Sequence, residues 1–66
     1  MQIRVNNETM TLENSLTVQA LLDMLQLDMR KIAVERNLEI VPRSSFEAIM
    51  LHEGDQVEII HFIGGG

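Results

Sequence analysis

The last three residues are those whose types and spacing best suit covalent chemistry. Gly64, Gly65 and Gly66 follow directly on an apolar run and place a carboxylate on a stem without side chains. A carboxylate is a poor electrophile, but an acyl adenylate carries a leaving group that sulfur, nitrogen or oxygen nucleophiles can displace. Glycine suits the narrow channel of an activating protein, because it adopts nearly any φ/ψ and lets backbone approach backbone. Terminal glycines are also commonly disordered and inert, so composition alone leaves both interpretations open.

Chemistry at such a tail requires a folded body that docks on the activating partner. Ordering the glycines costs about 3 to 6 kcal/mol, at about 1 to 2 kcal/mol per residue. Contacts made by the body have to offset this loss. The elements that precede the glycines should therefore supply both the stem and the docking surface.

Composition and charge exclude several other classes of site. The 66 residues carry 5 Lys and Arg against 10 Asp and Glu, a net charge of −5. Nucleic-acid binding requires clustered basic residues, so we expect no nucleic-acid partner. The chain has no Cys, which excludes a disulfide and a thiol nucleophile. No apolar run reaches the length of about 18 residues that a membrane span needs, so we expect no membrane contact and a cytoplasmic protein.

The remaining titratable residues form no recognisable catalytic or metal site. His52 and His61 have no Asp or Glu at a convincing ligand spacing, so we expect no bound metal. The sequence contains no plausible catalytic triad and no phosphate-binding glycine loop. We therefore expect no bound cofactor, no enzymatic activity of the chain itself, and a monomer when the protein is free.

The first part of the chain predicts a hairpin. Residues 1–6 alternate apolar and polar side chains, which is typical of a half-buried strand. Asn6-Asn7 then predicts a tight turn, because Asn tolerates positive φ. A second strand should follow over residues 9–13, with Met10 and Leu12 pointing inward.

A helix and a further strand follow the hairpin. The helix is indicated by apolar residues at i, i+3, i+4 and i+7, which are Val18, Leu21, Leu22 and Leu25. Thr17 precedes this stripe and is the predicted N-cap. A β-prone run then begins at Ile32 and passes into a turn over residues 37–39.

The last third predicts an edge strand, a helical turn and a central strand. Ile40-Val41-Pro42 is extended, and Pro42 places it at a sheet edge because proline cannot donate to a ladder. Ser44 and Glu47 have the spacing of a capping box that opens one helical turn. The run over residues 57–63 is apolar on both faces, which predicts a central strand covered more fully than an edge strand.

The docking surface should lie close to the glycines. Ile60 and Phe62 alternate with a second set of side chains, and one of the two sets has to face away from the helix. An exposed apolar patch there would mark a binding site. Arg43, which follows a proline at a turn, is able to anchor a phosphate or an acidic partner. Ile60, Phe62 and Arg43 are therefore the candidate partner-docking surface.

This order of elements predicts an α+β protein with the β-grasp fold. In that fold a mixed sheet wraps around one main helix, here with a short additional helical turn. The predicted β-grasp domain comprises residues 1–63. Residues 64–66 are the predicted flexible C-terminal glycine tail.

The whole chain resembles the ThiS family, the sulfur carrier proteins of thiamine biosynthesis. The resemblance rests on Ile40-Val41-Pro42-Arg43, on Phe46, on Leu51-His52-Glu53-Gly54-Asp55-Gln56-Val57-Glu58-Ile59-Ile60 and on the terminal glycines. It implies a ubiquitin-like β-grasp protein whose Gly66 carboxylate is adenylated by a ThiF-type adenylyltransferase with ATP and then converted to a thiocarboxylate. It also implies that this thiocarboxylate donates sulfur to the thiazole synthase ThiG. The chain departs from the family at Phe46, where members often have Trp, and at Leu38, where many have a small turn residue.

Three other functions remain open at this point. One is a MoaD-like sulfur carrier for molybdopterin synthesis, which uses the same tail chemistry. Another is a ubiquitin-like modifier joined through Gly66 to lysines of target proteins. The last is a β-grasp binding module with an inert tail. The short chain and the Ile-Val-Pro-Arg segment favour the ThiS interpretation.

Overall fold

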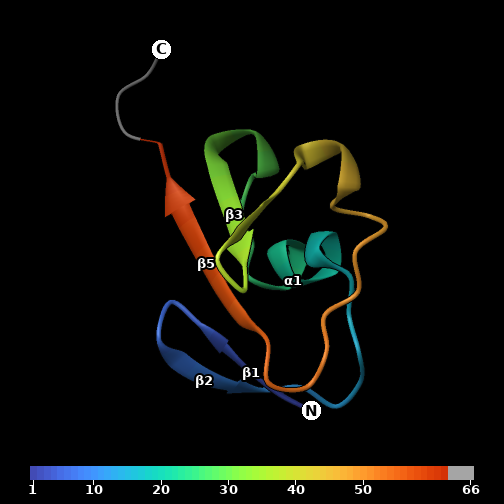
Figure 1. Ribbon diagram of the computed structural model, residues 1–66. Coiled ribbons are helices and arrows are strands. Elements are labelled where there is room, and N and C mark those ends of the chain that lie inside the picture. Colours follow the sequence, from blue (N-terminus) through green and yellow to red (C-terminus); the bar gives the residue numbers. More distant parts are fainter. Residues whose placement is uncertain (63–66) are drawn as a thin grey trace.

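The computed structural model describes residues 1–62 and shows one mixed sheet with a helix packed across one face (Figure 1). Its elements are β1 (Gln2–Val5), β2 (Glu8–Thr11), α1 (Val18–Met24), a 3-10 turn (Met29–Lys31), β3 (Ile32–Arg36), β4 (Glu39–Val41), a second 3-10 turn (Arg43–Ser45) and β5 (Gln56–His61). The strand order is β2-β1-β5-β3-β4. The strands β1 and β5 are parallel, and all other neighbours are antiparallel. The predicted α+β architecture is confirmed, whereas the predicted boundary at residues 63–64 lies outside the described residues.

Two hairpins lie on either side of the central strand β5. In the first, Asn6 and Asn7 have φ of 49° and 68° and join β1 directly to β2. In the second, Asn37 and Leu38 have φ of 51° and 71° and join β3 to β4. Positive φ at both central residues is the pattern of a type I′ turn, whose twist matches that of the flanking strands. The predicted Asn6-Asn7 turn is confirmed, and β2 begins at Glu8, one residue earlier than predicted.

Substitution of Leu38 by Gly should stabilise the protein. A side chain with a Cβ is strained at φ 71°, and Leu38 is 85% exposed, so little packing offsets this strain. Glycine relieves this strain, but it also raises the chain entropy of the unfolded state, which opposes part of the gain. The net effect should be an increase of about 0.5 to 1 kcal/mol in the free energy of unfolding. Urea denaturation measures the change. Leu38→Ala keeps the strain and should have little effect, and equal stability of the two variants would contradict the strain argument.

The helix α1 begins at the predicted cap. The hydroxyl oxygen of Thr17 accepts a hydrogen bond from the backbone N–H of Ala20 at 3.0 Å. The two preceding helical amides donate to carbonyl oxygens outside the helix, from Val18 to Ile49 and from Gln19 to Phe46, both at 2.9 Å. All the first amides of the helix are thereby satisfied. These bonds attach the start of α1 to the loop that follows β4.

The predicted capping box at Ser44 and Glu47 is wrong. A 3-10 turn spans Arg43–Ser45, with Pro42 at its N-cap and no side-chain capping bond. The turn begins earlier than predicted because Pro42, with φ of −60°, ends the β4 extension directly at the start of the turn. Ser44 therefore lies inside the turn and not at its N-cap position. The buried side chain of Phe46 follows immediately.

The central position predicted for the last strand is confirmed. The prediction that both faces of this strand are covered is wrong. β5 lies between β1 and β3. Its side chains alternate, with Val57 and Ile59 buried and with Glu58 and Ile60 exposed. Among the described residues, α1 is the only α-helix and packs on one face of the sheet. The other face of β5 is therefore open (Figure 1). Ile60 is consequently an exposed apolar residue in a central strand.

A single apolar core lies between the sheet and α1. Its buried members are Ile3, Leu12, Val18, Leu21, Leu22, Ile32, Val34, Val41, Phe46, Leu51, Val57 and Ile59. Every strand except β2 contributes to it, and the inward position predicted for Leu12 is confirmed. Within residues 1–62, no helix has the length and apolar character needed to cross a membrane.

Candidate functional site

The predicted reacting residues Gly64, Gly65 and Gly66 lie outside the described residues. The site is therefore defined by the strand that leads to them. β5 ends at His61, and the backbone N–H of Phe62 still donates to the carbonyl oxygen of Lys31 at 3.0 Å. The chain thus stays attached to the β3 side of the sheet up to the last described residue.

The open face of the sheet carries exposed apolar side chains next to this end of β5. Ile60 is 44% exposed and Phe62 is 58% exposed, whereas Ile59 is buried. The set that faces away from the helix is therefore the one that contains Ile60 and Phe62. Ile40 on the edge strand β4 is 65% exposed and was not selected from the sequence. Its alternation with the buried Val41 was the signal that would have identified it.

The structure brings two of the predicted docking residues together. Arg43 and Phe62 line one shallow depression of about 180 Å³, together with Ile40. Ile60 does not line it, but Ile60 lies opposite Ala33 in the β3–β5 register, and Ala33 does. We call Ile40, Ile60 and Phe62, together with Arg43 of the adjacent 3-10 turn, the open-face patch. Whether this patch docks a partner stays a prediction.

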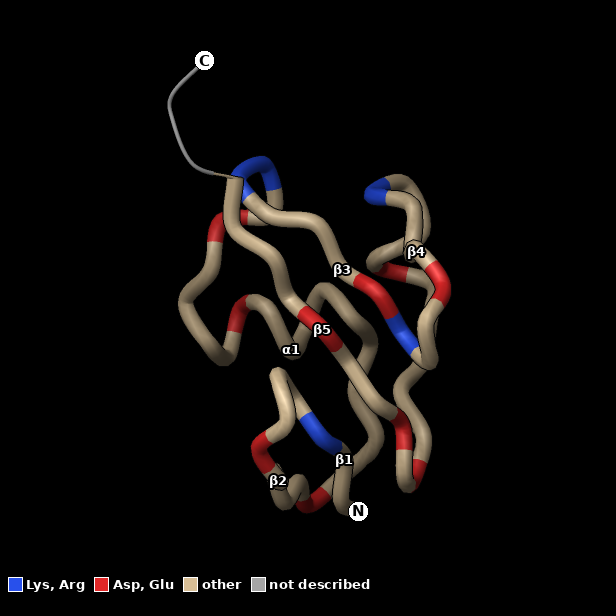
Figure 2. Tube along the Cα trace, turned by 60° about the vertical axis from the view of Figure 1, so that its left-hand side comes forward, with Lys and Arg blue, Asp and Glu red and all other residues tan. Residues whose placement is uncertain are grey.

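Basic residues lie at the same end of the molecule (Figure 2). Lys31 accepts the backbone bond from Phe62, and Arg43 shares the depression with Phe62. The neighbouring Arg30 is paired with Asp28 at 3.0 Å, and this pair holds the pKa of Asp28 down at about 2. The end of the sheet that leads to the glycines is therefore less acidic than the net charge of −5 suggests.

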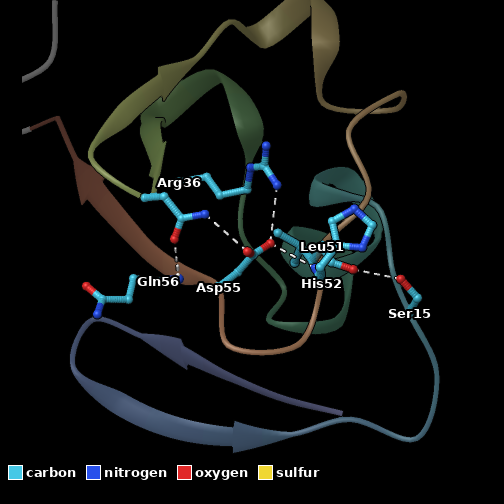
Figure 3. Close-up of polar contacts among 7 residues, drawn as sticks. Ser15, Arg36, Leu51, His52, Asp55 and Gln56 are labelled. Carbon is cyan, nitrogen blue, oxygen red and sulfur yellow. Dashed lines mark hydrogen bonds and ion pairs between the residues drawn. The ribbon is translucent and has the colours of Figure 1, made fainter.

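A buried carboxylate fixes the start of β5 (Figure 3). Asp55 is 7% exposed. Its Oδ2 accepts from the backbone N–H of His52 at 2.8 Å and from the guanidinium of Arg36 at 3.3 Å, and its Oδ1 accepts from Asn37 Nδ2 at 3.1 Å. Asn37 in turn accepts from the backbone N–H of Gln56. Asp55 therefore joins the β3–β4 hairpin to the turn before β5.

Sequence reasoning did not select Asp55 as an important residue. Burial alone would raise the pKa of Asp55. The hydrogen bonds from His52, Asn37 and Arg36, with the charge of Arg36, outweigh this effect and leave the pKa below its ordinary value. The carboxylate is thus held in its charged form, which the surrounding donors require.

Substitution of Asp55 by Asn should reduce stability near neutral pH. The donors at one carboxylate oxygen of Asp55 would lose their acceptor, which should lower the free energy of unfolding by about 1 to 3 kcal/mol. Because the pKa is lowered on folding, the native carboxylate stabilises the fold above the ordinary Asp pKa of 3.8, and this stabilisation is lost as the pH falls through the folded-state value. Urea denaturation at pH 7 and at lower pH should therefore show the difference between wild type and variant shrinking in acid. The exposed Asp23→Asn is the control, and a pH-independent difference would contradict this role.

Other titratable side chains do not converge on a site. His52 and His61 are both exposed. Within the described part of the chain, no group of three or more His, Asp or Glu side chains is arranged to hold a metal ion. The features that distinguish this end of the molecule are the end of β5, the open-face patch and the glycines that follow.

A mixed sheet around one helix, with the central last strand leading directly to glycines, defines a β-grasp protein of the ubiquitin-like class. The comparisons with known proteins narrow this class. The model of the ThiS family matches residues 3–66, and the chain belongs to that family.

Relatives of this chain include free-standing proteins and part of a longer one. A thiazole synthase of Paramagnetospirillum magneticum is 52% identical over 66 residues, which are 100% of this chain and 20% of that protein. The sulfur carrier protein ThiS of Bacillus subtilis is 42% identical over 50 residues, 76% of each chain. The crystal structure of the thiamine biosynthesis protein ThiS from Geobacter metallireducens aligns with a TM-score of 0.87 and 36% identity over 100% of both chains. The present chain thus spans about a fifth of the length of the thiazole synthase that it matches.

Proposed function

We propose that this chain is a sulfur carrier protein of thiamine biosynthesis and that its Gly66 carboxylate carries the sulfur. The observation that carries the proposal is a β-grasp body of the ThiS family whose central strand β5 leads directly to Gly64-Gly65-Gly66. A ThiF-type enzyme transfers AMP from ATP to the carboxylate and releases pyrophosphate. A sulfur donor then displaces AMP and leaves a thiocarboxylate, which donates its sulfur to a thiazole synthase of the ThiG type.

In this proposal the chain is a protein co-substrate and not an enzyme. ATP binds to the activating enzyme, so the carrier itself needs no cofactor. The carrier acts in the cytoplasm as a monomer that binds its two partners in turn. Residues 64–66 serve as the stem that enters each partner.

The open-face patch is the proposed docking surface. Its apolar side chains, Ile40, Ile60 and Phe62, are exposed next to the end of β5, so a partner that binds there receives the following glycines without a long connection. Arg43 at the same depression is available for an acidic group of the partner. Burial of this patch offsets the entropy lost when the tail is ordered.

The similarity to a thiazole synthase supports the choice of the second partner. In that relative, a region similar to this chain and a thiazole synthase belong to one polypeptide. Two activities that act in sequence profit from such a link, because it raises their effective concentration. The same reasoning favours a thiazole synthase over a molybdopterin synthase.

Intact-mass measurement tests the proposal. The purified chain is incubated with a ThiF-type enzyme, ATP and a sulfur source, and its C-terminal fragments are sequenced by mass. A gain equal to the exchange of one oxygen for sulfur, located on Gly66, is expected. An unchanged mass, with the enzyme active on a known carrier, would contradict the proposal. Transfer of the sulfur to molybdopterin synthase alone, or conjugates with target lysines, would instead support the MoaD-like or the modifier function.

A further inference from the structure

We propose that Asn6 is a positioning residue for the reacting end of the chain, which rests on the proposed function. The strand β1 pairs with β5 only at Arg4 with Gln56 and at Val5 with Val57. The chain then turns back into β2. Beyond Val57 the β1 side of β5 therefore has no neighbouring strand within the described residues.

The side chain of Asn6 occupies this position. Its backbone N–H donates to the carbonyl oxygen of Val57 at 2.9 Å. Its Oδ1 accepts from the backbone N–H of Ile59 at 2.8 Å, and its Nδ2 donates to the carbonyl oxygen of Ile59 at 3.3 Å. A carboxamide has the same donor and acceptor as a peptide unit. Asn6 thus adds one further step to the parallel ladder after β1 has ended.

Asn is the residue type that meets both requirements of this position. Asn6 has φ of 49°, where Asn is favoured among residues other than glycine. Glycine adopts this φ but has no side chain to pair with Ile59. Asp supplies an acceptor but no donor for the carbonyl oxygen of Ile59.

The location of these bonds connects them to the tail. Ile59 is the last described residue of β5 that is bonded on the β1 side, and Phe62 is bonded to Lys31 on the β3 side. If the Asn6 bonds are lost, the end of β5 is loosened and has to be ordered when a partner binds. Such a cost is paid on binding, so it should raise KM for the activating enzyme and leave kcat unchanged.

The test compares Asn6→Gly with Asn7→Gly. Asn7 lies in the same turn with φ of 68°, and no hydrogen bond joins its side chain to β5 in the described part of the chain. Both variants therefore gain the same backbone freedom, but only Asn6→Gly loses the bonds to Ile59. Asn6→Asp keeps an acceptor for the Ile59 amide and should lie between Asn6→Gly and the wild type.

Two measurements decide the role of Asn6. In Asn6→Gly, the KM of the ThiF-type enzyme for the carrier should rise about tenfold with kcat nearly unchanged, and the Ile59 amide of the free protein should exchange its hydrogen about tenfold faster. Asn7→Gly should match the wild type in both. Equal behaviour of the two glycine variants, with normal loading of the wild type, would overturn the role of Asn6 alone. A wild-type chain that gained no sulfur would overturn the proposed function and, with it, the effect on KM, while hydrogen exchange would still decide whether Asn6 holds β5.

Discussion

Removal of Gly65 and Gly66 should abolish sulfur loading while the fold stays as stable as in the full chain. The reacting carboxylate would move to Gly64, two residues beyond the last described residue, so we expect the stem to be too short to reach the site of adenylation. No core side chain is affected, because the core lies within residues 3–59. Intact-mass measurement after incubation with the activating enzyme should show no sulfur on the shortened chain.

The fold of the shortened chain is checked by its thermal midpoint, which should equal that of the full chain. Sulfur loading at the new terminus would contradict the proposed need for the stem. An unchanged biological activity of the shortened chain would contradict every carrier function and support a β-grasp binding module with an inert tail.

Substitution of Phe46 by Ala should unfold much of the protein. Phe46 is 2% exposed and is the largest fully buried side chain of the described residues. Loss of a buried Phe costs about 3 to 5 kcal/mol. A domain of this size has a total stability of about 3 to 10 kcal/mol, at about 0.05 to 0.15 kcal/mol per residue. Circular dichroism during urea denaturation should therefore show a large loss of stability.

The chain offers a matched control, since its other phenylalanine is Phe62. Phe62 is 58% exposed and belongs to the open-face patch. Phe62→Ala should leave the urea midpoint nearly unchanged and should weaken binding of the activating enzyme by about tenfold, as expected for an apolar anchor of an interface. Unchanged binding by a folded Phe62→Ala variant would contradict the proposed docking surface.

The sequence was sufficient where a structural element depends on neighbouring residues. The cap at Thr17 and the turn at Asn6-Asn7 follow from the side chains at those positions and were predicted correctly. The edge position of β4 followed from Pro42, and the structure places β4 at the end of the strand order. The β-grasp order could be derived because a helix separates two strand pairs.

One error arose from a stronger local signal and the other from the packing of a distant segment. Ser44 and Glu47 have the spacing of a capping box, but Pro42 and the burial of Phe46 set the start of the turn. Successive apolar residues in β5 predicted that both faces of this strand are buried. The one α-helix of the described residues covers only one face. Ile60 is therefore exposed although it lies in a central strand.

The polar contacts that organise the site could not have been derived from spacing. Asp55 is bonded to residues 36, 37 and 52, and Asn6 to Ile59. The bond from His52 is local to the turn, but the bonds from Arg36 and Asn37 to Asp55 and from Asn6 to Ile59 join segments that meet only when the sheet is assembled. The glycine tail, in contrast, was selected from residue type alone, and its chemistry remains a prediction that the mass measurement tests.

The strand order also has a consequence for synthesis on the ribosome. The central strand β5 is translated last of the five strands, and it joins the β1–β2 hairpin to the β3–β4 hairpin. Until β5 has emerged, the two hairpins have no shared strand and the core lacks Val57 and Ile59. Domain closure therefore has to wait for the residues immediately before the glycines. A truncated nascent chain would present neither the open-face patch in its folded form nor the tail. Under the proposed function, partner enzymes would therefore encounter only chains whose translation has passed through β5.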